Sequence, residues 1–126
     1  MTVTQQRVRL LWFPLACCLL SVACHREDRT TTGGGNSERG RQLVAQYACT
    51  ACHDIPGVRG PKGMVGPPLS GMGGRSMIAG KIPNTPQNLE RWIENPQALD
   101  PNNAMPNLNV TPKDAQDIAA FLYTLR

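Results

Sequence analysis

Two cysteines and a histidine, set close together in the sequence CTACH at residues 49–53, constrain this 126-residue chain more than any other feature. The Cys-x-x-Cys-His spacing is the attachment sequence of c-type haem, in which the two thiols add to the vinyl groups of the porphyrin. The histidine that follows lies beneath the iron and binds it. The sequence therefore predicts that Cys49 and Cys52 hold one covalent haem c and that His53 is an iron ligand.

Two other uses of a Cys-x-x-Cys pair have weaker support. A dithiol redox centre is expected beside a βαβ pattern, and no segment alternates regularly enough to predict a β-strand. A zinc site needs a second pair of ligands, whereas the other histidine, His25, lies in a polar stretch far from the pair. Haem attachment is the interpretation that remains.

Composition favours a small domain built around such a group. Only 5% of the residues are aromatic, whereas 12 are Gly and 11 are Pro. So few large apolar side chains cannot fill a conventional core, and a domain of this size then needs a disulfide, a metal or a cofactor. A covalent haem supplies the missing apolar centre, and we expect the chain without it to be largely unfolded.

The N-terminal part of the chain is typical of a secretory signal peptide. Arg7 and Arg9 precede an apolar run at residues 10–23, which is too short to span a bilayer. The run ends in Ser-Val-Ala-Cys, which is compatible with two kinds of processing. Either signal peptidase cuts after Ala23 and leaves Cys24 unmodified, or Cys24 receives a lipid, as in bacterial lipoproteins. An uncleaved anchor is a further alternative.

We therefore expect a signal peptide at 1–23, a flexible tether at 24–36 and a folded domain at 37–126. The tether is polar and contains three consecutive glycines, a composition that cannot bury surface. Export places the domain on the periplasmic side of a bacterial membrane, where a lipid on Cys24 would hold it.

The charge balance argues against nucleic acid as a partner. The chain has 13 basic and 9 acidic residues, and removal of the signal peptide takes away two arginines and no acid, which lowers the net charge from +4 to +2. The remaining basic residues form no runs, so the domain lacks the basic patch of a nucleic-acid-binding protein.

Three helices are predicted in the domain, each from a capping residue followed by apolar residues at helical spacing. The first covers residues 37–48 with Ser37 as its N-cap, and Gly40 within it offers a place for close backbone approach. The second starts after Thr85 and the third after Thr111, each with a proline at its first position. The residues expected to face inward are Leu43, Val44, Tyr47, Leu89, Trp92, Ile93, Ala115, Ile118, Ala119, Leu122 and Leu125, with Phe121 flanking them.

With these elements the chain resembles a class I cytochrome c over residues 37–126. The likeness includes the helix before the attachment sequence, a Gly-Pro loop at 66–67, a Met-Pro pair at 105–106 and the last helix. The run at 83–97, with the Met-Pro pair, is similar to the cytochrome c domain fused to subunit II of haem–copper terminal oxidases. The resemblance implies an all-α fold, in which three or more short helices and Gly/Pro-rich loops wrap around one covalent haem.

The second iron ligand is expected to be a methionine. Met105 lies 52 residues beyond His53, directly before the last helix, so that the chain between them can pass around the haem to its opposite face. We predict Met105 as the ligand, with Met77 as the alternative. Core packing is the predicted role of Met64, Met72 and, unless it binds iron, Met77.

Three further residues are assigned to the haem surroundings. The resemblance implies that Nδ1–H of His53 donates a hydrogen bond to the carbonyl oxygen of Pro67, which fixes the ring. Arg75 and Trp92 are candidate donors to the haem propionates. The alternatives are a solvated arginine at the surface and an aromatic side chain in the core.

A histidine–methionine pair leaves the iron no open site for oxygen or peroxide, and the soft thioether stabilises ferrous iron. The predicted function is one-electron transfer in a bacterial respiratory chain rather than catalysis, with a membrane oxidase or dehydrogenase complex as the partner. Docking is expected near Cys49 and Cys52. Two alternatives are a haem-bearing accessory subunit of a larger oxidase or dehydrogenase, and a five-coordinate haem peroxidase or sensor in which Met105 does not bind iron.

Overall fold

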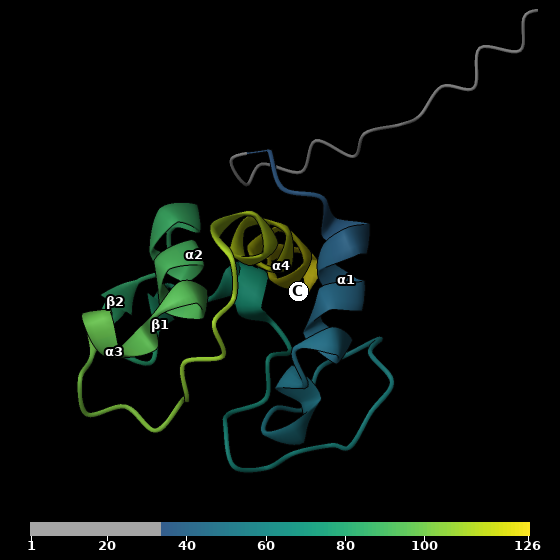
Figure 1. Cartoon of the computed structure of the whole chain (residues 1–126), viewed down its shortest axis with the longest axis horizontal. Coiled ribbons are helices and arrows are strands. Elements are labelled where there is room, and N and C mark those ends of the chain that lie inside the picture. Colours follow the sequence, from purple (N-terminus) through teal and green to yellow (C-terminus); the bar gives the residue numbers. More distant parts are fainter. Residues whose placement is uncertain (1–33) are drawn as a thin grey trace, which may run out of the picture.

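The computed structural model describes residues 34–126. The segments predicted as signal peptide and, for the most part, as tether lie outside this range, including Cys24 and His25. Four α-helices account for most of the regular structure in this range (Figure 1). None of the helices described is long and apolar enough to cross a membrane. The elements are α1 (Ser37–Gln46), η1 (Cys49–Ala51), η2 (Met72–Gly74), β1 (Met77–Ile78), β2 (Ile82–Pro83), α2 (Pro86–Glu94), α3 (Pro96–Leu99) and α4 (Pro112–Thr124), where η denotes a 3₁₀ helix.

Helix α4 lies between α1 and α2 and packs against both (Figure 1). The crossing of α1 and α4 is close because Gly40 has no side chain: a β-carbon there would fall 1.9 Å from the backbone oxygen of Asp117. The prediction that Gly40 permits close backbone approach is confirmed. The buried core that this packing creates includes Leu43, Val44, Leu89, Ile93, Ala115, Ile118, Ala119, Phe121 and Leu122.

The cap of α1 differs from the prediction. Asn36, not Ser37, is the N-cap, because its side-chain oxygen accepts a hydrogen bond from the backbone N–H of Arg39 at 2.9 Å. Asparagine and serine cap helices about equally well, so two such residues in sequence leave the start uncertain by one position. The helix also ends two residues earlier than expected, before Ala48 adopts a left-handed φ of 53°.

Two residues that the sequence assigns to the tether contact α4. Gly35 is buried, and a β-carbon there would lie 2.4 Å from the backbone oxygen of Gln116. The backbone N–H of Asn36 donates to the Asp117 carboxylate at 2.8 Å. Among the described residues, packing against α4 thus begins at Gly35.

Asp117 is a charged residue in the core that the sequence analysis did not single out. It has 0% exposed surface and accepts from Arg39 Nη1 at 2.5 Å and from Lys113 Nζ at 2.7 Å, besides the N–H of Asn36. Burial by itself raises the pKa of this carboxyl, but the N–H of Asn36 and the two cations outweigh that effect and hold the pKa below its usual value. The ionised side chain of Asp117 therefore connects the start of α1 to α4.

The predicted starts of the other two helices are confirmed. The Thr85 side chain accepts from the N–H of Asn88 at the start of α2, and the Thr111 side chain accepts from the N–H of Asp114 at the start of α4, both at 3.2 Å. A proline follows each threonine and leaves no N–H unpaired there.

Two features of the middle of the chain were not predicted. Strands β1 and β2 pair antiparallel through Met77 with Pro83 and Ile78 with Ile82. Each strand has only two residues, too few for a pattern of alternation to be visible in the sequence. Helix α3 follows α2 directly, and Asn95 is both the C-cap of α2 and the N-cap of α3. The all-α class still holds, because this small sheet is the one sheet in the described part of the chain.

Candidate cofactor site

The two cysteines and the histidine are held on one tight turn. Cys49 begins η1, and its carbonyl oxygen accepts from the backbone N–H groups of Cys52 at 3.2 Å and His53 at 3.0 Å. Both thiols are free and half-buried. Burial raises the pKa of the Cys49 thiol to about 11, so at neutral pH it keeps its hydrogen. A protonated thiol carries both the sulfur and the hydrogen that add across a carbon–carbon double bond when a thioether forms.

The imidazole of His53 has a fixed orientation. Its Nδ1 lies 2.7 Å from the carbonyl oxygen of Pro67, which is the contact that the resemblance implied. A carbonyl oxygen only accepts, so Nδ1 carries the hydrogen and Nε2 of the neutral ring keeps a lone pair for a metal. Gly66 makes room for the ring, because a β-carbon at this glycine would lie 2.4 Å from Cε1 of His53.

The loop that follows is fastened to the attachment segment by three backbone hydrogen bonds. The N–H groups of Gly63, Gly66 and Leu69 donate to the carbonyl oxygens of Thr50, Cys52 and Asp54, at 3.0, 2.8 and 2.9 Å respectively. These hydrogen bonds bring the Pro67 carbonyl oxygen within hydrogen-bond distance of Nδ1 of His53. The sequence analysis missed the role of Gly63, and nothing sets it apart from the other glycines of this loop in the sequence.

The predicted methionine ligand lies on a different segment. The chain between α3 and α4, which carries Met105, runs beside α2 and α3, whereas η1 lies below α1 (Figure 1). Two hydrogen bonds hold the Met105 backbone: its N–H donates to Asn103 Oδ1 at 2.8 Å, and its carbonyl accepts from Gln97 Nε2 at 2.5 Å. Met105 is half-buried.

The other methionines behave differently from one another. Met72 is 5% exposed and belongs to the core, as predicted. The prediction that Met64 and Met77 fill the core is wrong, since they are 92% and 38% exposed. Met77 stands on the outer face of β1, whose other residue, Ile78, faces inward. Met64 lies between two glycines that bring the backbone, not the side chain, against the attachment segment.

Arg75 and Trp92 lie in different parts of the molecule. One guanidinium nitrogen of Arg75 donates to the carbonyl oxygens of Pro68 at 2.5 Å and Ser70 at 3.0 Å, directly after the carbonyl that holds His53. Trp92 is half-buried on α2 and packs against the core, which agrees with the alternative prediction of an aromatic side chain in the core. Donation by either residue to a propionate stays a prediction.

Asn84 is a further residue that the sequence analysis missed. Its amide nitrogen donates to the carbonyl oxygens of Met72 and Arg75, both at 2.9 Å, and its amide oxygen accepts from the Tyr123 hydroxyl at 2.9 Å. Asn84 thereby ties the Arg75 segment to α4. Its one signal in the sequence is its place in the run at 83–97 that resembles the oxidase-linked domains.

The residues present fit a haem. The donor set consists of two thiols, an imidazole with a free Nε2 and a thioether, which are the groups that attach and ligate a c-type haem. Several apolar side chains at the margin of the core are only partly covered by protein atoms, as expected of side chains that a planar apolar group would cover. These side chains are Cys49, Leu69, Ile82, Trp92 and Leu108.

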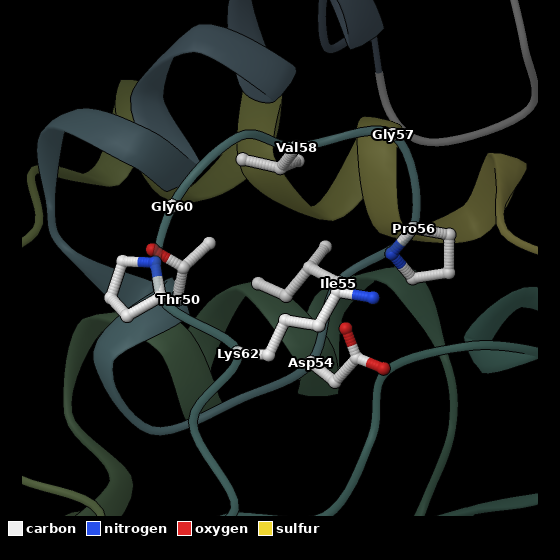
Figure 2. A pocket seen from close by; sticks show the side chains of 9 residues that line it. Thr50, Asp54, Ile55, Pro56, Gly57, Val58, Gly60 and Lys62 are labelled. Atoms are coloured by element: carbon white, nitrogen blue, oxygen red, sulfur yellow. The ribbon is translucent and has the colours of Figure 1, made fainter.

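A pocket of about 310 Å³ lies beside the attachment segment but contains none of the predicted ligands (Figure 2). Its walls include the Thr50 side chain, and Figure 2 shows the side chains of Asp54 and Ile55 facing into the space that the 56–62 loop encircles. The pocket lacks a thiol, an imidazole and a thioether, so it is distinct from the candidate haem site. Its lining is Thr50, Asp54, Ile55, Pro56, Gly57, Val58, Gly60, Pro61 and Lys62.

The chain is similar to a known protein family and to one protein of known name. The family model described as Cytochrome c matches residues 37–126. A cytochrome c oxidase subunit 2 from Alkalihalophilus pseudofirmus is 34% identical over 91 residues, which cover 71% of this chain and 26% of that protein. The chain thus spans about a quarter of the length of this relative.

Proposed function

Because this chain belongs to the cytochrome c family, we propose that it is a one-electron carrier of a bacterial respiratory chain and exchanges electrons with a membrane oxidase or dehydrogenase complex. Membership of the family implies electron transfer through a covalently bound haem c, and an electron-transfer protein rather than an enzyme. When bound, this group supplies an iron that cycles between Fe(II) and Fe(III). The roles below are those of the chain's own residues.

One observation carries the proposal: the hydrogen bond of 2.7 Å between Nδ1 of His53 and the carbonyl oxygen of Pro67. It leaves Nε2 free to ligate a metal and fixes the ring on the same turn as the two thiols. In this proposal Cys49 and Cys52 hold a single haem through two thioethers, and His53 is the ligand on that side.

Met105 is proposed as the residue that would supply the second iron ligand. Its backbone is fixed by Asn103 and Gln97, so its side chain starts from a defined position on a segment remote from η1. Met72 is packed in the core, and Met64 is an exposed residue of the loop that Gly63 and Gly66 fasten to the attachment segment. If His53 and Met105 both held the iron, no site would be open to peroxide, which favours a carrier over a peroxidase or sensor.

Visible spectroscopy of the haem-loaded protein tests this proposal. We expect the oxidised form to show the weak far-red band of a ferric iron–sulfur bond, and the reduced form not to bind added carbon monoxide. Rapid binding of carbon monoxide by the reduced protein, with no far-red band, would reveal an open coordination site and favour the enzyme or sensor.

A haem-bearing accessory subunit is the second candidate function. It is favoured by the similarity to a protein named as an oxidase subunit, of which this chain matches a quarter. Solubilised membranes distinguish the two: a subunit stays with a larger complex through purification at high salt, whereas a carrier separates from it.

We also propose that the protein is exported and tethered to the periplasmic side of the membrane through a lipid on Cys24. The support is the sequence pattern of residues 1–24, since these residues lie outside the described range. Mass spectrometry of the mature N-terminus is the test. A diacylglycerol-modified Cys24 supports the tether, whereas an unmodified Cys24 at the N-terminus indicates simple secretion.

A further inference from the structure

The methionines at positions 64, 72, 77 and 105 differ widely in exposure. Met72 is 5% exposed in the core, Met77 is 38% exposed on β1, and Met64 is 92% exposed. Met105 is half-buried, and two hydrogen bonds fix its backbone. Oxidants convert a methionine thioether to the sulfoxide. Because this reaction needs an encounter between the sulfur and a solute, the thioether of Met64 is the one that an oxidant in solution reaches most easily.

The backbone on either side of Met64 imposes its exposure. A β-carbon at Gly63 would lie 2.3 Å from the Ala51 oxygen, and one at Gly66 would lie 2.4 Å from the His53 ring. The N–H groups of the same two glycines donate to carbonyl oxygens of the attachment segment, at 3.0 and 2.8 Å. The chain is thus fixed against that segment before and after Met64, and the Met64 side chain is left in solvent.

Oxidation has different consequences at the different methionines, because it makes an apolar side chain polar. At Met72 the new oxygen would be buried among apolar side chains, which destabilises a core. At Met105 it would replace the soft sulfur of the proposed iron ligand by a hard oxygen. The Met64 side chain is not among the described side chains that pack against the core, so water would solvate its sulfoxide and no packing would be lost.

The contacts that hold His53 are also independent of the Met64 side chain. They are made by the backbone of the two neighbouring glycines and by the carbonyl oxygen of Pro67. A sulfoxide at Met64 therefore leaves the orientation of the imidazole unchanged.

We propose that Met64 is a modification site, at which the domain takes up an oxygen atom from a hydroperoxide before its other described methionines react. With hydrogen peroxide, a lone pair of the sulfur attacks one peroxide oxygen, the sulfur–oxygen bond forms and the oxygen–oxygen bond breaks. The sulfur loses two electrons, and the second oxygen leaves with both hydrogens as water. The domain thus consumes one equivalent of oxidant and keeps its core and its Met105 thioether. Met64 has no role in the proposed electron transfer, so this site goes beyond that function.

Peptide mapping by mass spectrometry measures the order of modification in the oxidised, haem-loaded mature protein. Hydrogen peroxide is added, catalase stops the reaction at set times, and fragment spectra locate each added oxygen. Fragment spectra are needed because no lysine or arginine separates Met64 from Met72. We expect Met64 to react about tenfold faster than Met72 and about twofold faster than Met77, in the order of their exposure, with the visible spectrum unchanged meanwhile.

Met64→Leu removes the thioether and keeps a side chain of similar volume. The initial rate of oxygen uptake by the protein should fall about twofold, and the first sulfoxide should form at Met77 instead. Met77→Leu is the matched control, since Met77 is the other exposed methionine of the described range, and it should keep Met64 as the first site.

Met64→Gln tests whether a polar side chain is tolerated at this position without any oxidant present. The variant should keep the visible spectrum, the reduction potential and the denaturation midpoint of the wild type. Met72→Gln, which places the same amide in the core, should lower the denaturation midpoint.

Faster modification of Met77 or Met105 than of Met64 would overturn the site, and so would a lower denaturation midpoint or an altered spectrum in Met64→Gln. Peroxide that bleaches the haem while Met64 stays unmodified would overturn the site and the carrier function together, because it would reveal an open coordination position. Modification of Met64 first, in a protein that lacks the far-red band, would support the site and remove Met105 as the iron ligand.

Discussion

The α1–α4 crossing and the cofactor side of the molecule differ in how far protein atoms alone complete their packing and their hydrogen bonds. At the crossing, Gly40 lets the backbones meet, and the buried Asp117 carboxylate has three donors from Asn36, Arg39 and Lys113. On the cofactor side, Leu69, Ile82, Trp92 and Leu108 are only partly covered, and the one hydrogen bond of the His53 ring within the described residues uses Nδ1 and not Nε2.

The difference shows which half of the fold is self-sufficient. Protein atoms alone satisfy the packing and the polar groups of the crossing. The other half leaves apolar surface and ligand atoms for a group that the chain does not encode. Four variants, the first of them a double substitution, test this difference between the two halves, and they follow in order of decreasing expected effect on stability.

Replacement of both thiols, Cys49→Ala with Cys52→Ala, should abolish covalent haem and leave the chain largely unfolded, because a small domain without its cofactor lacks a sufficient core. A haem-stained denaturing gel and far-ultraviolet circular dichroism measure the two effects. Ala51→Ser, at the exposed position between the cysteines, should keep both haem and helix content. A colourless variant with native helix content and cooperative unfolding would contradict the dependence of this half on haem.

Gly40→Ala tests the stability of the α1–α4 crossing. Its β-carbon would fall 1.9 Å from the Asp117 oxygen, so the two helices must move apart, at a cost on the order of 3 kcal/mol in the free energy of unfolding. Denaturant unfolding of the haem-loaded protein gives this value. Gly74→Ala is the matched control, because a β-carbon there meets nothing within 4 Å, and it should change stability by less than about 1 kcal/mol. Equal effects at the two positions would mean that the crossing can relax.

Asp117→Asn removes the buried charge and keeps the shape. We expect a loss of about 2 kcal/mol, since the amide nitrogen that replaces one carboxylate oxygen cannot accept a hydrogen bond and the remaining oxygen carries no charge. Because the folded pKa of Asp117 lies below its usual value, the carboxylate stabilises the fold at neutral pH, and this contribution fades as the pH falls below about 4. The difference between wild type and variant should therefore shrink in acid. Glu38→Gln, which breaks the exposed pair with Arg41, should have a much smaller effect at every pH.

Met105→Leu is expected to have the smallest effect on stability, below about 1.5 kcal/mol, because the two side chains have similar volume. Covalent haem should remain, while the far-red band disappears and the reduction potential falls, since the soft sulfur ligand is lost. Met72→Leu, in the core, should leave the spectrum unchanged. An unchanged spectrum in Met105→Leu, together with an altered one in Met77→Leu, would move the ligand to Met77.

Local signals carried most of what the sequence predicted. Thr85 and Thr111 were predicted as caps because a cap depends only on the few residues after it. Gly40 was recognised because a glycine on the apolar face of a helix has few other uses. The attachment sequence is equally local, which is why Cys49, Cys52 and His53 were predicted together.

Features that depend on distant contacts were missed. Asp117 is read from the sequence as a polar residue on a helix, and only the packing of α1 brings Asn36 and Arg39 to it. Met64 was assigned to the core by its residue type, but the two glycines around it decide the outcome through contacts with Ala51 and His53. Strands of two residues carry too little pattern to be predicted at all.

The partner of His53 Nδ1 has one more consequence. The acceptor is the main-chain oxygen of Pro67, an amide group that neither gains nor loses a proton in the range where proteins function. A carboxylate in its place would change the electron density on the ring each time it titrated. Because this acceptor does not titrate, its capacity to accept the hydrogen bond from Nδ1 is the same at every pH, and it is kept in every substitution at position 67 that preserves the path of the backbone.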